Sequence, residues 1–195
     1  MDFQAWRRQV REYSEITNLG PIARRYFVIG AFDGALTILG IIVGAYAAGA
    51  REAARPIILT AALSAAIALA VSSAVGAYEA ERLEKKLDIS TIERAMLSRL
   101  SEEHRDAFRF AAIVSAVVHG VAPILAAAPP VVPFLFLGMD EAIFVAIVVT
   151  MAILFAMGAY LGNLVRERVV ITGLRFVAAG LATSILLWLL RGGAL

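Results

Sequence analysis

The chain has 195 residues, of which 61% are hydrophobic and 17% charged, and its mean hydropathy is +0.80. A soluble domain of this length would not bury so much apolar surface, so the composition predicts an integral membrane protein. The sequence has no cysteine, which excludes disulfides, thiolate metal sites and cysteine redox motifs. The net charge of +2 and the pI near 9.2 would suggest a nucleic-acid partner in a soluble protein, but we expect none here because the basic residues serve the membrane topology.

The first 25 residues are polar and charged, so we expect no cleavable signal peptide there. Phe3, Trp6, Val10 and Tyr13 recur at three- and four-residue spacing. This pattern predicts an amphipathic helix that lies on the membrane surface or packs on another cytoplasmic segment. Residues 1–25 are therefore expected to form a cytoplasmic N-terminal segment.

Five apolar stretches are long enough to cross about 30 Å of hydrocarbon as helices. Two lie within residues 26–78 and three within residues 108–195, and a charged connection, residues 79–107, separates the groups. The third stretch runs into PPVVP, which predicts a broken helix end or an apolar lumenal loop and not a further span. We predict an all-α, multi-pass membrane protein with five transmembrane helices. The stretches are Tyr26–Ala48, Pro56–Tyr78, Phe108–Ala128, Ala142–Gly162 and Val169–Leu190.

The basic residues predict the orientation. Fifteen of the 18 Lys and Arg residues lie before the first span, between spans two and three, or after span four. The opposite side holds Arg51, Arg55 and Arg191. Since Lys and Arg concentrate in cytoplasmic loops, we expect the N-terminus in the cytoplasm and the C-terminus outside.

The connection between spans two and three is short and rich in both charges. Ser90 to Glu93 (STIE) matches a capping box, which predicts a new short helix through Leu100. Ser101 would cap the following helix. Glu81 and Lys85 stand four residues apart and could pair. The acids of this segment could bind a divalent cation, but a solvated, salt-bridged helical surface explains them equally well.

Asp33 is the single formally charged residue in the first span. A carboxylate in hydrocarbon costs roughly 2.5–3.5 kcal/mol, so we predict an ion or proton site there; the alternative is an Asp that is protonated or hydrogen-bonded to a neighbouring helix. Small residues on its face would let another helix approach closely, and two copies would place two carboxylates near one axis, where they could bind a cation. These residues are Gly30, Gly34, Thr37, Gly40 and Gly44.

His119 is the only histidine within a predicted span, and it shares a helix face with Ser115. It could relay protons or serve as a packing residue. The sequence contains no HExxH, no Gly-rich loop followed by Lys-Ser/Thr, and no GxSxG motif. We therefore do not expect an enzyme.

Three segments resemble the vacuolar iron transporter (VIT) family. Arg25–Thr37 (RYFVIGAFDGALT) resembles that family's first helix with its intramembrane Asp, and Val71–Ala80 (VSSAVGAYEA) is similar to the end of its second helix. His119–Leu135 (HGVAPILAAAPPVVPFL) resembles its third helix and the following Pro-containing turn. The five spans and the charged loop also match, and the short loop is similar to that of prokaryotic-type members.

The resemblance implies export of Fe²⁺ or Mn²⁺ from the cytoplasm, in exchange for protons, by a homodimer in the cell membrane. The ion is cargo, and we expect no permanently bound cofactor. The path would run between the first helices of two subunits past Asp33, with Thr37 and Ser73 as oxygen donors and Glu79 at the cytoplasmic mouth. Glu102 and Glu103 would join Asp33 and Glu79 as candidate metal ligands, and His119 would be the candidate proton relay.

Two departures from the family pattern keep alternatives open. Plant and yeast-type members have a longer cytoplasmic helical domain whose glutamates gather metal, whereas the corresponding piece here, Glu79–Asp106, has 28 residues. The family's membrane-embedded Met falls on Ser73 in our alignment, which removes a soft ligand. The chain could therefore be a VIT-like scaffold or accessory subunit without transport activity, or a carrier for another cation.

Overall fold

The computed structural model describes residues 3–193, and its regular elements within that range are all helices. Five helices are long and apolar enough to cross a membrane, which confirms the predicted all-α fold with five spans. The helices are α1 (Phe3–Thr17), α2 (Leu19–Ala47), α3 (Arg55–Met96), α4 (Glu102–Val131), α5 (Met139–Leu164) and α6 (Val169–Gly193), with short 3-10 helices at Glu52–Ala54 and Val132–Leu135.

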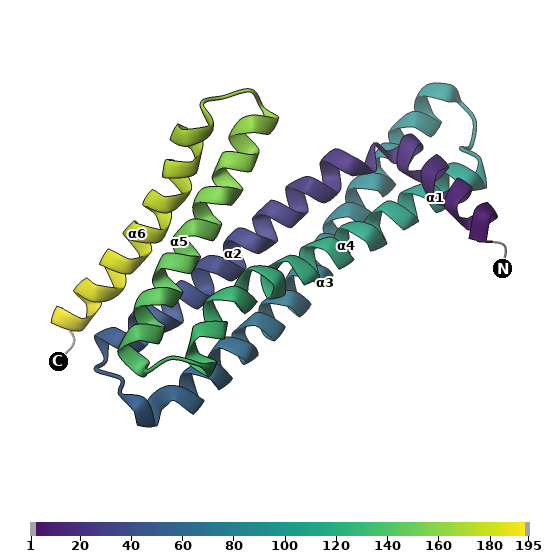
Figure 1. The fold of residues 1–195 in the computed structure, drawn as a ribbon. Helices are drawn as coiled ribbons and strands as arrows, with labels where there is room; N and C mark the ends of the chain where they lie inside the picture. Colours follow the sequence, from purple (N-terminus) through teal and green to yellow (C-terminus); the bar gives the residue numbers. More distant parts are fainter. Residues whose placement is uncertain (1–2, 194–195) are drawn as a thin grey trace.

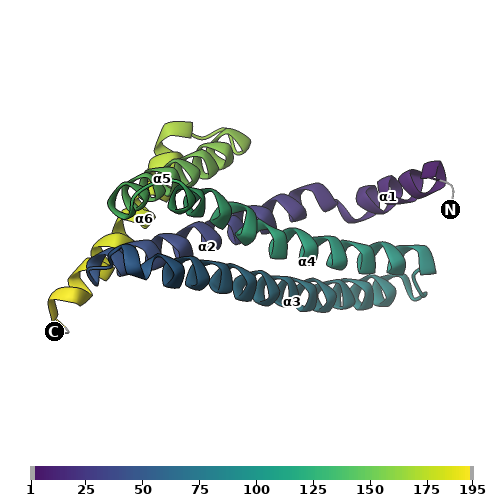
Figure 2. The same cartoon turned by 60° about the horizontal axis from the view of Figure 1, so that its bottom comes forward.

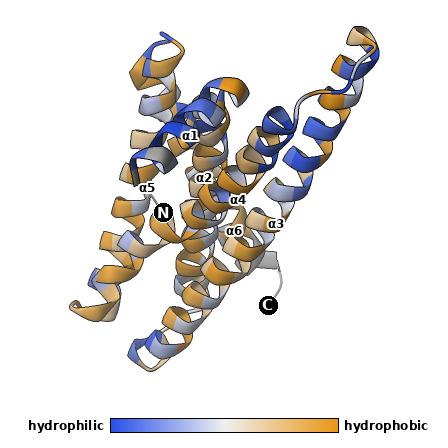
Figure 3. Ribbon diagram, turned by 90° about the vertical axis from the view of Figure 1, so that its right-hand side faces the viewer, coloured by the Kyte–Doolittle hydropathy of each residue, from blue (hydrophilic) through white to orange (hydrophobic). Residues whose placement is uncertain are grey.

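Helix α2 lies at the centre and contacts every other helix (Figure 1). Helices α3 and α4 run antiparallel along one side of it, and the α5–α6 hairpin covers another (Figure 2). Hydrophilic residues gather on α1 and on the adjoining ends of α3 and α4, whereas the rest of the bundle is mainly hydrophobic (Figure 3). Charged residues are therefore concentrated at one end, where the sequence predicts the cytoplasm, although a smaller group that includes Glu52 and Arg55 lies at the other end.

The core forms where α2 meets α3 and α5. Ile38 and Ile42 of α2 are fully buried, and they belong to one cluster with Ala62 of α3 and Ala146 of α5. Small residues on the outer helices let these branched side chains fill the space between the backbones. Because α2 is apolar on almost all sides, it can be the helix that its neighbours surround.

Gly30 and Gly34 of α2 pack against another helix of the same chain, α4, and not against a second copy. A Cβ on Gly34 would lie 2.5 Å from the carbonyl oxygen of Pro123 in α4. A Cβ on Gly30 would lie 2.8 Å from the carbonyl oxygen of His119. Since Pro123 has no N–H to donate to the His119 carbonyl, α4 lacks one intrahelical hydrogen bond at the point where α2 approaches it. Glycine is thus required where the two backbones meet.

The predicted helix start at Ser90 is wrong. Helix α3 continues without a break to Met96, so the second span and most of the cytoplasmic connection form one helix. The helix ends at Leu97, which adopts the left-handed conformation that glycine usually supplies. Ser101 does precede α4, as predicted, but its hydroxyl contacts His104 Nδ1 instead of capping the backbone.

Glu93 closes the turn between α3 and α4. Its Oε1 accepts a hydrogen bond from the Leu100 N–H at 3.0 Å and another from Arg105 Nη2 at 2.7 Å. The hydrogen bond from Leu100, and after it the one from Arg105, lower the pKa of Glu93 from its ordinary 4.5. A carboxylate whose pKa is lowered on folding stabilises the folded turn above its unfolded pKa, and this contribution disappears as the pH falls through the folded value.

We therefore expect the turn to loosen as the pH falls below about 4.5. Leu97 is 94% exposed, and the chain has no native cysteine, so a spin label on Leu97→Cys would report the mobility of the turn. The mobility of the label should rise as the pH is lowered from 6 to 3 in this variant. With Glu93→Gln added, it should be high at both values; an unchanged pH response in that double variant would contradict the assignment.

At the opposite end of the bundle, Arg55 holds the loops together. Its guanidinium donates 2.8 Å hydrogen bonds to the carbonyl oxygens of Phe134 and Leu137. These carbonyls lie beyond the point where α4 gives way to a 3-10 helix, which confirms the predicted broken end. The side chain of Arg191, the third basic residue expected on this side, lies outside the described side chains.

Candidate functional site

One face of α2 is left uncovered by the helices of this chain. It consists of Ile29, Asp33, Thr37, Gly40 and Gly44, which follow one another at three- or four-residue spacing, and we call it the open face of α2. Ile29 is 46% exposed, and Asp33 and Thr37 are partly exposed. A Cβ on Gly44 would meet no atom within 4 Å, and one on Gly40 would meet just a side-chain carbon of Leu187, at 3.8 Å.

Asp33 has no side-chain hydrogen bond or ion pair with any residue that the structure describes. Thr37 lies one turn further along the same face, so its hydroxyl is the nearest oxygen donor by helical spacing. No hydrogen-bonding partner on a neighbouring helix is therefore present, within residues 3–193, to support the alternative of a structurally bonded Asp. The arrangement is a carboxylate inside an apolar span, facing out of the single chain.

Two further predicted path residues lie on α3. Ser73 is partly exposed, and Glu79 makes an ion pair with Arg82 at 2.7 Å. Glu79 stands half a turn away from the face of α3 that packs on α4, so its carboxylate points away from that contact. The carboxylate predicted for the cytoplasmic mouth is thus accessible and engaged by a neighbouring arginine.

Glu102 and Glu103 occupy the first turn of α4, and both are exposed. Carboxylates at this position interact favourably with the helix N-terminus. Within the described part of the chain, no three His, Asp or Glu side chains come together in a way that could hold a metal ion. A single copy therefore does not unite the predicted ligands.

His119 ties α4 to α2. Its Nδ1 lies 2.8 Å from the carbonyl oxygen of Tyr26, and the two rings are 5.2 Å apart. Because a carbonyl oxygen can only accept a hydrogen bond, His119 Nδ1 carries the hydrogen in this contact, and Nε2 is the second ring nitrogen. Ser115, one turn earlier, is fully buried, and its hydroxyl has no partner among the described residues. A packing role for His119 is visible here, and Nε2 remains available for a proton.

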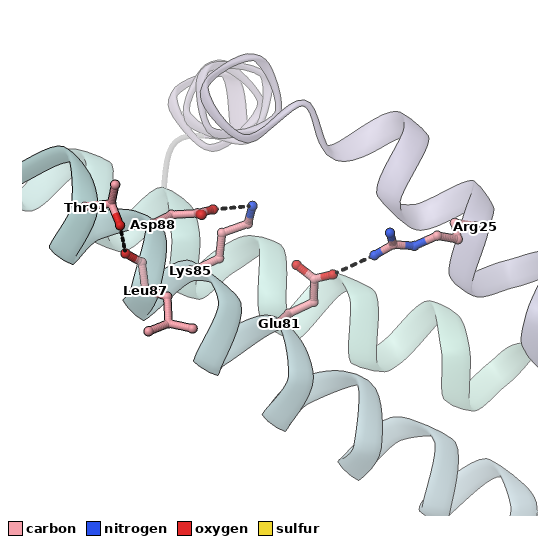
Figure 4. Close-up of polar contacts among 6 residues, drawn as sticks. All are labelled: Arg25, Glu81, Lys85, Leu87, Asp88 and Thr91. Carbon is pink, nitrogen blue, oxygen red and sulfur yellow. Dashed lines mark hydrogen bonds and ion pairs between the residues drawn. The ribbon is translucent and has the colours of Figure 1, made fainter.

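Glu81 is the functional candidate that the sequence analysis missed. Its side chain is 1% exposed, and its Oε1 lies 3.3 Å from Nη2 of Arg25, a residue of α2 (Figure 4). The other oxygen, Oε2, is buried without a hydrogen-bond partner among the described residues. The predicted pairing of Glu81 with Lys85 is wrong, because Lys85 instead contacts Asp88 at 3.3 Å (Figure 4).

A signal for the burial of Glu81 does exist in the sequence. Ala70, Ala74 and Ala77 form a small-residue stripe on α3, and Glu81 continues it at four-residue spacing. Gly120 of α4 packs on this stripe, because a Cβ there would lie 2.9 Å from the Ala74 Cβ. An acid buried on the contact face of a helix needs a counter-charge, and the partly exposed Arg25 of α2 supplies it.

The sequence pattern of the VIT family matches residues 24–107 and 91–190. An uncharacterized protein of Methanocaldococcus jannaschii is 32% identical over 177 residues, which cover 88% of this chain and 90% of the relative. The matched regions include α2 with Asp33, the α3–α4 pair and the α5–α6 hairpin.

Proposed function

Because the chain belongs to the VIT family, a family of membrane metal-ion transporters, we propose that it exports Fe²⁺ or Mn²⁺ from the cytoplasm in exchange for protons. The observation that carries the proposal is Asp33, a carboxylate in an apolar span without a hydrogen-bond or ion-pair partner among the described residues. A charge in that position is costly, and a passing cation or proton would compensate it.

A second copy of the chain would complete the site. Hard divalent cations take about six oxygen ligands, and the open face of α2 supplies one carboxylate and one hydroxyl. Two open faces related by a two-fold axis would bring together two Asp33 and two Thr37 side chains. Gly40 and Gly44 support this arrangement, since their uncovered surfaces allow a second backbone to approach closely. In this proposal the path follows the dimer axis.

The remaining predicted residues fit a route from the cytoplasm. Glu79, Glu102 and Glu103 would attract cations at the charged end, Ser73 would donate a further oxygen, and His119 Nε2 would pass protons. The distribution of basic residues supports a cytoplasmic N-terminus and an external C-terminus. The proposed location is the cell membrane of a prokaryote, and Fe²⁺ or Mn²⁺ is cargo there, not a resident cofactor.

Metal binding tests the site directly. Electron paramagnetic resonance measures free Mn²⁺ in solution. Adding purified native protein should lower this free-ion signal, because Mn²⁺ bound to the protein no longer contributes to it. Asp33→Asn should abolish this binding, whereas Asp140→Asn, the same change at an exposed residue of α5, should leave it intact. Equal binding by the native protein and Asp33→Asn would contradict a metal site at Asp33, and no binding by the native protein would favour a scaffold or a carrier for another cation.

The dimer can be tested separately by cross-linking. Gly44→Cys should form a disulfide between two copies under mild oxidation, because a disulfide requires Cα atoms within about 7 Å. Val148→Cys, on the exposed face of α5, should not cross-link under the same conditions. The absence of native cysteines makes each product unambiguous. A dimer that forms through Val148→Cys but not through Gly44→Cys would contradict the proposed axis.

A further inference from the structure

A groove of about 640 Å³ lies between the cytoplasmic halves of α3 and α4. Five cationic side chains line it, and one carboxylate, that of Glu93, accompanies them. Its floor is apolar, with Phe108 and Ile113 among the lining residues. The groove therefore combines positive charge with hydrocarbon surface. The five cations are Arg82, Lys85, Lys86, Arg105 and Arg109.

Several donors in this groove are left unused by the protein. Arg105 Nε is buried and has no hydrogen-bond partner, although Nη2 of the same residue binds Glu93. Lys86 has no ion pair within residues 3–193. The Lys85 side chain is 15% exposed, and its ammonium lies 5.7 Å from the Phe108 ring centre, with a single 3.3 Å contact to Asp88. Lys85 and Lys86 thus line the groove with few acidic partners in the protein.

The acids at the rim do not neutralise the groove strongly. Arg82 pairs with Glu79, and Arg109 pairs with Asp106 at 3.5 Å, in each case three residues away along an exposed helix surface. Water screens such exposed pairs, so they contribute little to stability. A phosphate offers Arg and Lys several acceptor oxygens at once and a bidentate geometry for Arg. An anionic phosphate group can therefore compete for these side chains.

The position of the groove identifies the source of that phosphate. Tyr78 marks the end of the second apolar span, and the groove extends past it to Ile113. Beyond Ile113, the exposed side chains of Val75 and Val117 continue as an apolar surface toward the middle of the membrane. Clustered Lys and Arg next to a membrane span attract anionic lipids of the cytoplasmic leaflet. The combination fits an amphiphile with its headgroup among cations and its chains along hydrocarbon.

We propose that the α3–α4 groove binds an anionic phospholipid, with the phosphate held by Lys85, Lys86 and Arg109 and the acyl chains lying along Val75, Ile113 and Val117. This site is separate from the open face of α2 and does not depend on the transported ion. A bound lipid also supplies the counter-charge for the cationic ends of α3 and α4 where they leave the membrane.

The test uses the full chain and native mass spectrometry with phosphatidylglycerol and phosphatidylcholine of identical acyl chains. The native protein should retain phosphatidylglycerol in preference. The groove variant Lys85→Gln/Lys86→Gln/Arg109→Gln should lose that preference by about tenfold or more, since each juxtamembrane cation contributes on the order of 1 kcal/mol. The matched variant Arg94→Gln/Arg166→Gln/Arg168→Gln, with the same loss of charge outside the groove, should keep it.

Two results would overturn the proposal. Equal losses in the groove variant and the matched variant would mean that net charge alone attracts the lipid. Displacement of the bound species by millimolar glycerol 3-phosphate, with no requirement for acyl chains, would assign the groove to a soluble phosphate compound. Circular dichroism of each variant checks that its helices are intact. Lys86→Gln alone removes no ion pair among the described residues, and it should still weaken phosphatidylglycerol binding.

Discussion

Replacing Gly34 with alanine is expected to destabilise the protein by about 1–3 kcal/mol, the usual cost of overpacking a close contact. The added Cβ would lie 2.5 Å from the carbonyl oxygen and 2.6 Å from the Cα of Pro123. Both are backbone atoms of a proline inside α4, so no side-chain rotation relieves the overlap. Helices α2 and α4 must separate, and Asp33, which adjoins Gly34, must move with α2.

Gly76→Ala is the matched control for this prediction. Gly76 also lies within a helix, α3, but a Cβ there would meet no atom within 4 Å. Alanine is favoured over glycine in a helix by about 1 kcal/mol, so this variant should be as stable as the native protein or slightly more stable. Thermal unfolding in detergent compares the two variants. Equal melting temperatures for Gly34→Ala and Gly76→Ala would contradict the α2–α4 contact described here.

Removal of the Arg25 guanidinium is expected to have a comparable or larger effect. Arg25→Ala would leave the Glu81 carboxylate buried at 1% exposure without its counter-charge. Breaking a buried pair from one side costs about 3–5 kcal/mol. Because Arg25 itself is 56% exposed, water can partly replace it, and we expect about 2–4 kcal/mol. The junction of α2 with α3 should become the weakest part of the bundle.

The second partner provides the control. Glu81→Gln removes the negative charge and keeps the size of the side chain, so adding it to Arg25→Ala should recover most of the lost stability. The double-variant cycle reports the interaction between the two residues because they are in contact. If Arg25→Ala were as damaging with Glu81→Gln as without it, the loss would come from packing and not from the buried charge.

The five spans could be predicted because each is an apolar run of sufficient length, and composition decides that feature without tertiary contacts. The continuation of α3 past Ser90 could not be predicted, because the capping-box pattern is a local signal and the preceding helix runs through it. The helix ends at Leu97, which has a positive φ without being a glycine, so the sequence gives no signal of this end. Glu93, the acid of the expected capping box, instead binds Leu100 and Arg105, which lie across the turn.

The candidate site was only partly predictable for a similar reason. Asp33 stands out in the sequence because a charge in an apolar run is rare. The partner of Glu81 could not be identified, since Arg25 lies 56 positions away in the chain and the two meet only when α2 packs on α3. Gly30 and Gly34 were correctly read as contact residues, whereas contact at Gly40 and Gly44 stays a prediction, and spacing alone does not say which helix a glycine contacts. Gly30 and Gly34 pack on α4, and Gly40 and Gly44 remain uncovered.

The central claim, that Asp33 carries a divalent metal ion through the membrane, is tested most directly by transport in proteoliposomes. Native protein and Asp33→Asn would be compared for Mn²⁺ and Fe²⁺ movement under an imposed pH gradient. Asparagine removes the charge with little change in volume. We expect the native protein to move both metal ions across the membrane, and Asp33→Asn to show no more metal movement than liposomes without protein. Equal flux through both folded proteins, or no flux through either, would contradict it.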